Sequence, residues 1–138
     1  MRSDQKTRIV VASEDRSASA AIGMLIDAQP DLELAGEVSD IAELLVKIKA
    51  QRPELVVLDW EMLGQRIETL VDLLELFEEP PMIVALSVHE DLREAALASG
   101  VVGFAFKGDP PSRLLETIRA LRRDKNQDTN LNGTGAQS

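Results

Sequence analysis

The sequence predicts an α/β fold in which five parallel strands alternate with five helices. Four short hydrophobic runs show no polar alternation, which is typical of strands covered on both faces. Segments with the apolar spacing of amphipathic helices separate these runs. Because strand and helix patterns alternate along the whole domain, the economical topology is a right-handed, doubly wound parallel sheet.

The first elements have distinct patterns. Residues 8–13 form an apolar strand, whereas residues 32–38 alternate weakly, as an edge strand does. Between them one helical face carries the apolar residues Ala18, Ala21, Ile22, Leu25 and Ile26. Asp40 with Glu43 resembles a capping box and predicts the start of a second helix, which Pro53 ends. That helix has an apolar stripe of Ile41, Leu44, Leu45 and Ile48.

Proline and glycine delimit the next elements. Residues 55–58 and 82–86 form apolar strands, and a proline pair at 80–81 breaks the chain before the second of them. The third helix lies between these strands, with an apolar face of Ile67, Leu70, Val71 and Leu74. A fourth helix covers about residues 92–99, and Gly100 is well placed to end it.

The last strand and helix complete the domain. Residues 103–106 form the fifth strand, and the final helix begins near Pro111, where a missing N–H costs nothing. Its inward residues are Leu114, Leu115, Ile118 and Leu121. We assign residues 7–123 to one domain and expect residues 1–6 to be a disordered N-terminus. Residues 124–138, which are polar and rich in Gly and Asn, should be a tail or linker.

Composition excludes several classes of function. The 138 residues suit a single domain, and no run of 18 apolar residues predicts a membrane span. The N-terminus lacks the apolar stretch of a signal peptide, so we expect a cytoplasmic protein. The absence of cysteine excludes thiol chemistry, and a single histidine argues against a zinc site. A net charge of −9 disfavours direct nucleic-acid binding.

Polar residues follow four of the predicted strands. In chain order they are Glu14 and Asp15, then Asp59, Ser87 and Lys107. Because the carboxyl ends of parallel strands meet at one edge, where ligands of open α/β sheets bind, we expect these side chains to gather there. Acids with a lysine and a hydroxyl suit a hard divalent cation and a phosphoryl group.

These residues carry a resemblance to the receiver domains of two-component response regulators. The motif elements are Ser13-Glu14-Asp15, Val57-Leu58-Asp59, Leu86-Ser87 and Phe106-Lys107. Their order, strand-end placement and separations are together specific, and the resemblance covers about residues 7–123. The sequences of residues 87–91 and 103–109 are similar to the corresponding segments of receivers that precede helix-turn-helix DNA-binding domains. The resemblance implies a flavodoxin-like (βα)5 fold with strand order 2-1-3-4-5.

The resemblance also implies a role for each residue. Asp59 would be the phosphoacceptor, taking a phosphoryl group from a histidine kinase or phosphotransfer protein to give an acyl phosphate. Lys107 would pair with one phosphoryl oxygen, and the Ser87 hydroxyl would donate to another. Mg²⁺ would bind to Glu14, Asp15, Asp59 and a backbone carbonyl at Glu61. Such a domain is a signalling phosphoacceptor rather than an enzyme.

A switch is implied as well. Ordering of Ser87 toward the phosphoryl group would leave space for Phe104 to turn inward. That movement would reshape the face made by the fourth helix, the fifth strand and the last helix, through which we expect a homodimer after phosphorylation. His89 either borders the phosphoryl site or lies in an exposed loop.

Some positions depart from the family pattern, and other functions stay open. Leu63 stands where receivers commonly have proline, and Glu14 replaces the commoner Asp. One alternative is a phosphorylation-independent adaptor that keeps the fold and acts by binding alone. Another is a phosphatase of the dehalogenase type. That class requires a second Asp two residues after the nucleophile, and this chain has Glu61 there. Mg²⁺-dependent modification of Asp59 by a small phosphodonor distinguishes the receiver from the adaptor.

Overall fold

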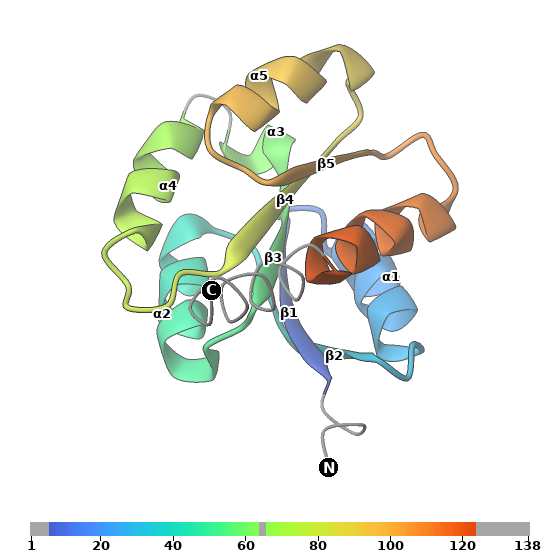
Figure 1. Cartoon of the computed structure of the whole chain (residues 1–138), viewed down its shortest axis with the longest axis horizontal. Helices are drawn as coiled ribbons and strands as arrows, with labels where there is room; N and C mark the ends of the chain where they lie inside the picture. The colour runs from blue at the N-terminus through green and yellow to red at the C-terminus, as the bar shows by residue number, and fades with distance from the viewer. Residues whose placement is uncertain (1–5, 64–65, 124–138) are drawn as a thin grey trace, which may run out of the picture.

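A computed structural model describes residues 6–63 and 66–123, and Figure 1 shows the arrangement of their helices and strands. One parallel sheet contains the strands β1 (Thr7–Ala12), β2 (Leu32–Val38), β3 (Leu55–Asp59), β4 (Met82–Ser87) and β5 (Gly103–Phe106). The strand order is β2-β1-β3-β4-β5, which confirms the predicted fold class and order. Residues 1–5 and 124–138, predicted to be a disordered N-terminus and a tail, lie outside the described residues.

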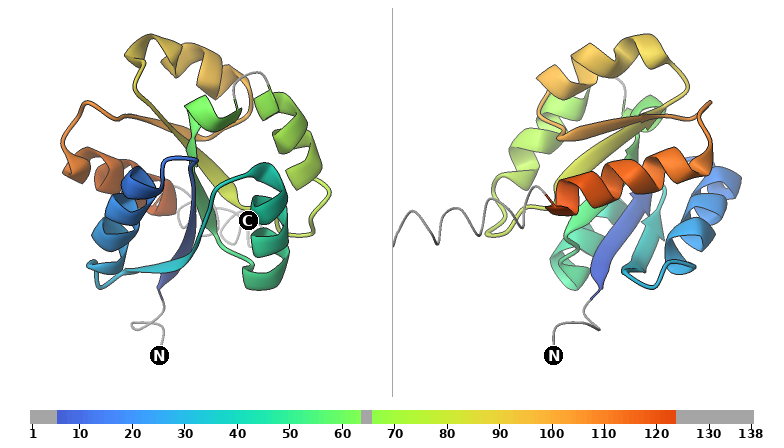
Figure 2. Two further views of the ribbon diagram at one scale, coloured as in Figure 1. Left: turned by 180° about the vertical axis from the view of Figure 1, so that it is seen from behind. Right: turned by 45° about the vertical axis from the view of Figure 1, so that its right-hand side comes forward.

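Helices cover both faces of this sheet (Figure 2). They are α1 (Arg16–Asp27), α2 (Ile41–Gln51), α3 (Trp60–Leu63), α4 (Ile67–Leu74), the 3-10 turn η3 (Glu90–Leu92), α5 (Arg93–Ala98) and a C-terminal helix at 111–123. The side chains of α1 and the C-terminal helix pack on one face of the sheet, and those of α2, α4 and α5 pack on the other.

The strands β1 and β3 divide the core into two halves. Ile9 and Val11 belong to the half beneath α1 and the C-terminal helix, whereas Val10 belongs to the half beneath α2 and α4. All three are at most 1% exposed. Because successive side chains of a strand point to opposite faces, such a strand is apolar at every position, which explains the uninterrupted runs in the sequence. Burying each side chain contributes about 1.5–3 kcal/mol.

Two helical segments differ from the prediction. α3 is a single turn after β3, too short for an apolar period to reveal it. The fourth helix, expected at about residues 92–99, is α5 at Arg93–Ala98, and only the 3-10 turn η3 before it was not expected. Gly100 ends this segment as predicted, with a positive φ of 115° that suits glycine. A Cβ at this position would also lie 3.0 Å from a methyl group of Val71.

Among the residues that the structure describes, no helix is both long enough and apolar enough to cross a lipid bilayer.

An ion-pair cluster fastens the C-terminal helix to the loop before β2. Arg119 donates to both carboxylate oxygens of Asp31, at 2.9 and 3.0 Å, and Arg122 donates to one of them at 2.6 Å. Hydrogen bonds of this forked geometry are the stronger kind of charged contact. Hydrogen bonding from Arg119 outweighs the opposing effect of burial and lowers the pKa of Asp31 from 3.8 to about 2.

We expect Asp31→Asn to lower the free energy of unfolding at pH 7 by about 1 kcal/mol, because a partly exposed ion pair contributes about that much. A lowered pKa in the folded state stabilises the protein above pH 3.8, and this stabilisation is lost as pH falls through about 2. Urea unfolding at several pH values measures the difference, with the exposed Asp72→Asn as control. A difference between wild type and Asp31→Asn that is the same at pH 7 and pH 2 would contradict this assignment.

Candidate functional site

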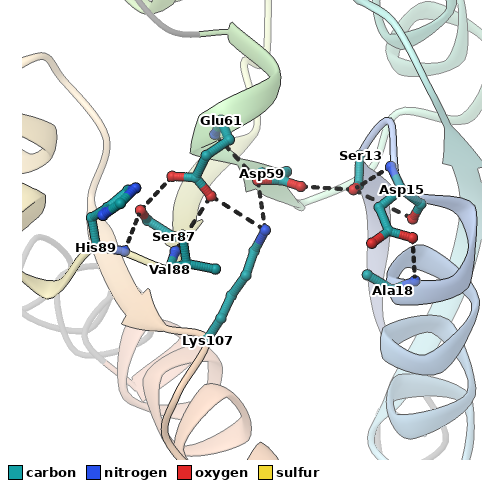
Figure 3. A network of polar contacts seen from close by, with 9 residues as sticks. All are labelled: Ser13, Asp15, Ala18, Asp59, Glu61, Ser87, Val88, His89 and Lys107. Atoms are coloured by element: carbon teal, nitrogen blue, oxygen red, sulfur yellow. Dashed lines mark hydrogen bonds and ion pairs between the residues drawn. The ribbon is translucent and has the colours of Figure 1, made fainter.

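Five polar side chains gather at the carboxyl edge of the sheet (Figure 3). Asp59 and Ser87 are the last residues of β3 and β4, Ser13 and Lys107 follow β1 and β5, and Glu61 lies in the short helix α3. The parallel register between neighbouring strands brings the ends of β3, β4 and β5 to the same edge. The structure therefore brings together Asp59, Ser87 and Lys107, as the strand pattern predicts.

The Asp59 carboxylate is buried and both of its oxygens accept hydrogen bonds. Asp59 is 7% exposed. Its Oδ1 accepts from the Lys107 ammonium at 2.9 Å and from the backbone N–H of Glu61 at 3.2 Å, while Oδ2 accepts from the Ser13 hydroxyl at 2.8 Å. A buried carboxylate requires such partners, because its charge is otherwise costly to remove from water.

Lys107 is the cation of the site. Its Nζ contacts Asp59 and also lies 3.3 Å from the Glu61 carboxylate. Burial acts to lower the pKa of the Lys107 ammonium, but hydrogen bonds and charges from the two carboxylates outweigh it and raise this pKa above its ordinary value. The ammonium is therefore fully charged at neutral pH.

The Glu61 side chain accepts hydrogen bonds from two neighbouring strand ends. Its Oε2 accepts from the Ser87 hydroxyl at 2.5 Å, and its Oε1 accepts from the Val88 backbone N–H and from Lys107, each at 3.3 Å. Sequence reasoning gave Glu61 only a backbone role. Its position two residues after Asp59 was visible, but the turn of α3 that directs its side chain to Ser87 was not.

Ser13 lies between Asp59 and Asp15, as Figure 3 shows. Its hydroxyl donates to Asp59 and accepts from the backbone N–H of Asp15 at 3.1 Å. The Asp15 carboxylate instead caps α1, accepting from the backbone N–H of Ala18 at 3.1 Å. Glu14 is exposed. A buried hydroxyl, rather than either predicted acid, is thus the direct neighbour of Asp59 at the end of β1.

The described side chains do not form a ready-made cluster for the Mg²⁺ that the resemblance implies. Within residues 6–63 and 66–123, no three acidic or histidine side chains lie close enough to hold a metal ion together. Asp59 uses both oxygens for hydrogen bonds, and Asp15 uses one as a helix cap. The predicted ligand set of Glu14, Asp15, Asp59 and the Glu61 carbonyl stays a prediction.

The two remaining predicted residues flank this network. Phe104 is buried at 4% exposure, and the Arg93 guanidinium covers its ring at 4.9 Å from the centroid. The Arg93 Nη1 also donates to the Phe104 carbonyl at 3.4 Å. The backbone N–H of His89 donates to the Ser87 hydroxyl at 3.0 Å, while His89 as a whole is exposed. His89 therefore contacts the site through its backbone.

The site combines a nucleophile with donors for an oxyanion. A carboxylate beside an ammonium can attack an electrophile, and a hydroxyl and a backbone N–H on the neighbouring strand end can stabilise negative charge that develops there. These groups are placed by strand ends, so they need little reorganisation.

We expect Ser13→Asp to raise the affinity for Mg²⁺ by about tenfold, because a second carboxylate beside Asp59 adds one hard ligand worth about 1.4 kcal/mol. The fluorescence of Trp60, which packs beside the site, measures the titration. Ser17→Asp, on the exposed part of α1, is the matched control. Equal Mg²⁺ affinity in wild type and Ser13→Asp would contradict this account.

The chain is similar to parts of several longer proteins, although no protein family model matches it. It is 31% identical to a protein-glutamate methylesterase/protein-glutamine glutaminase of Geobacter sulfurreducens, over 87% of this chain and 32% of that protein. It is 23% identical to the probable transcriptional regulatory protein NarL of Mycobacterium tuberculosis, over 83% of this chain and 54% of that protein. The chain thus spans between a third and about half of these curated relatives.

Solved structures show the same fold. The signal receiver domain of the response regulator NarL from Mycobacterium tuberculosis matches 86% of this chain and 98% of its own, with a TM-score of 0.75 and 22% identity. The isolated receiver domain of RcsB from Salmonella enterica, determined with the phosphomimetic BeF3-, matches 86% of this chain and 90% of its own, with a TM-score of 0.74 and 17% identity.

Proposed function

We propose that this chain, which is a response regulator receiver domain, accepts a phosphoryl group on Asp59 and signals by a change of shape. The observation that supports this proposal most strongly is the contact between the buried Asp59 carboxylate and the Lys107 ammonium, 2.9 Å apart. Ser87 supplies a hydroxyl at the neighbouring strand end. Nucleophile, cation and oxyanion donor thus meet at the sheet edge where ligands of open α/β sheets bind.

The proposed reaction is a phosphoryl transfer from a phosphohistidine whose other ring nitrogen carries a proton. A carboxylate oxygen of Asp59 attacks the phosphorus, the bond from phosphorus to the histidine nitrogen breaks, and its electron pair stays on that nitrogen, so a neutral imidazole leaves. The product is an acyl phosphate. Lys107 would offset the negative charge during the transfer. Ser87 and the Val88 N–H, which donate to Glu61 in this structure, would donate to phosphoryl oxygens instead. Mg²⁺, if Asp59 and the neighbouring acids hold it, would offset the charge of the phosphoryl oxygens.

The proposed phosphodonor is a histidine kinase or a phosphotransfer protein. A mainly apolar groove of about 250 Å³ runs beside Lys107, between α1 and the C-terminal helix. It is lined by Ala18, Ala21, Ile22, Leu25, Leu86, Phe106, Lys107, Asp109, Pro110, Pro111 and Leu114. Because Lys107, which contacts Asp59, lines this groove, an apolar helix face that packs there would lie next to the site, and the groove supports a protein donor.

A phosphorylation-independent adaptor is the second candidate. The observation that favours it is the Glu61 carboxylate, which already binds the donors that a phosphoryl group would need. In that case the domain would act by binding alone. The third reading, a phosphatase of the dehalogenase type, gains no such support, because Glu61 accepts from Ser87 and Lys107 instead of standing free as an acid-base residue.

We expect phosphoramidate, with Mg²⁺ in the buffer, to add one phosphoryl group to the domain. The product should be labile to base and to hydroxylamine, as an acyl phosphate is. The isosteric Asp59→Asn should abolish the labelling. Lys107→Ala should blunt the accompanying change in Trp60 fluorescence more than the labelling itself, while the exposed Lys49→Ala serves as control. Intact-protein mass spectrometry measures the labelling.

Two results would count against the proposed function. A phosphoryl group that persists in Asp59→Asn, on a serine or threonine, would contradict the assigned nucleophile. A wild-type protein that is never labelled, and whose phosphohistidine donor transfers nothing, would favour the adaptor.

A further inference from the structure

We propose that the Glu61 carboxylate is an internal ligand of the phosphoryl-binding position. By filling that position it would hold the unmodified domain in the arrangement that a phosphoryl group on Asp59 is otherwise needed to produce. This inference rests on the proposed function, because it assumes that the position is made for a phosphoryl group on Asp59.

Three donors from two strand ends converge on the two oxygens of this carboxylate (Figure 3). The Ser87 hydroxyl donates at 2.5 Å from the end of β4, and the Val88 N–H donates at 3.3 Å from the next residue. Lys107 donates at 3.3 Å from beyond β5 while it also holds Asp59. A hydroxyl, a backbone N–H and an ammonium around one anionic group form an oxyanion site, and Glu61 is its occupant.

The charge and exposure of Glu61 suit an occupant that can be displaced. A carboxylate and a phosphoryl group are both anionic acceptors, so each satisfies the same donors. The Glu61 side chain is 34% exposed, whereas the Asp59 side chain beneath it is 9% exposed. Glu61 is thus the more solvent-exposed of the two carboxylates. A phosphoryl group bound to Asp59 would have to replace it, and the freed side chain has solvent to enter.

The predicted switch residues already have the arrangement expected after phosphorylation. Ser87 has no exposed surface and directs its hydroxyl to Glu61, next to Asp59. The Phe104 ring is turned inward, with 4% exposure, beneath the Arg93 guanidinium. The anion to which the Ser87 hydroxyl donates is the Glu61 carboxylate. The inward state of Ser87 and Phe104 would therefore depend on Glu61.

The first test compares the rates of labelling by phosphoramidate in wild type, Glu61→Ala and Glu61→Asp. Both variants should be labelled about tenfold faster than wild type. Each removes hydrogen bonds to the charged Glu61 carboxylate, and the free energy of one such bond corresponds to about a tenfold change in rate. Glu61→Asp is decisive because it keeps the negative charge but shortens the side chain. Simple repulsion of the phosphodonor would leave Glu61→Asp like wild type, which would overturn the proposal. Glu68→Ala, an exposed acid of α4, is the matched control.

The second test follows hydrogen exchange of the Val88 amide, whose N–H donates to Glu61. This amide should be protected in unmodified wild type and exchange faster in Glu61→Ala, and beryllofluoride should restore protection in that variant. Equal exchange in both unmodified proteins would overturn the proposal.

Failure of the inference is distinguishable from failure of the proposed function. If Asp59 were labelled at the same rate in all the variants, its role as phosphoacceptor would stand, but the proposal that Glu61 is an internal ligand would be wrong. Absence of labelling in every variant, including Glu61→Ala, would contradict the phosphoacceptor and, with it, this inference.

Discussion

The buried contact between Asp59 and Lys107 is the interaction on which the site depends. Removing a carboxylate from water is costly, and breaking a buried ion pair on one side typically costs on the order of 3 kcal/mol. The fold offsets this cost by bringing the two charges into contact at the strand ends. β3 carries the Asp59 carboxylate, β5 leads to the Lys107 ammonium, and β4 lies between them in parallel register. The apolar core sets this register, so the position of the charges follows from packing beneath them.

A second anion changes what this pair can do. Lys107 is shared between Asp59 and Glu61, and Ser87 is turned toward Glu61. A site with an unoccupied oxyanion position would gain its order only when a phosphoryl group arrives. Here the position is already filled, so the difference in free energy between the unmodified and modified arrangements should be small. A ligand shifts such an equilibrium only by its differential affinity for the two states. The proposed receiver would then respond weakly to phosphorylation while Glu61 is in place.

The strand pattern predicted most of the site, whereas the strand order came from the resemblance to receiver domains. Asp59, Ser87 and Lys107 stand where apolar runs end, and the parallel pairing of the strands brings them to one edge of the sheet. The roles of Ser13 and of the Glu61 side chain were not predicted, for physical reasons. Whether the hydroxyl of Ser13 or the carboxylate of Asp15 faces Asp59 depends on where β1 stops and α1 begins, a boundary of one or two residues. Glu61 reaches Ser87 because α3 makes one turn, too short for any periodic signal.

The central claim is that Asp59, Lys107, Ser87 and the Val88 N–H form a phosphoryl-binding site that Glu61 occupies. A crystal structure of Glu61→Ala with beryllofluoride tests this claim most directly. The account predicts beryllofluoride bound to an Asp59 oxygen, with its fluorine atoms accepting from Ser87, the Val88 N–H and Lys107. Asp59 left without beryllofluoride in that variant, or beryllofluoride bound away from these donors, would contradict it.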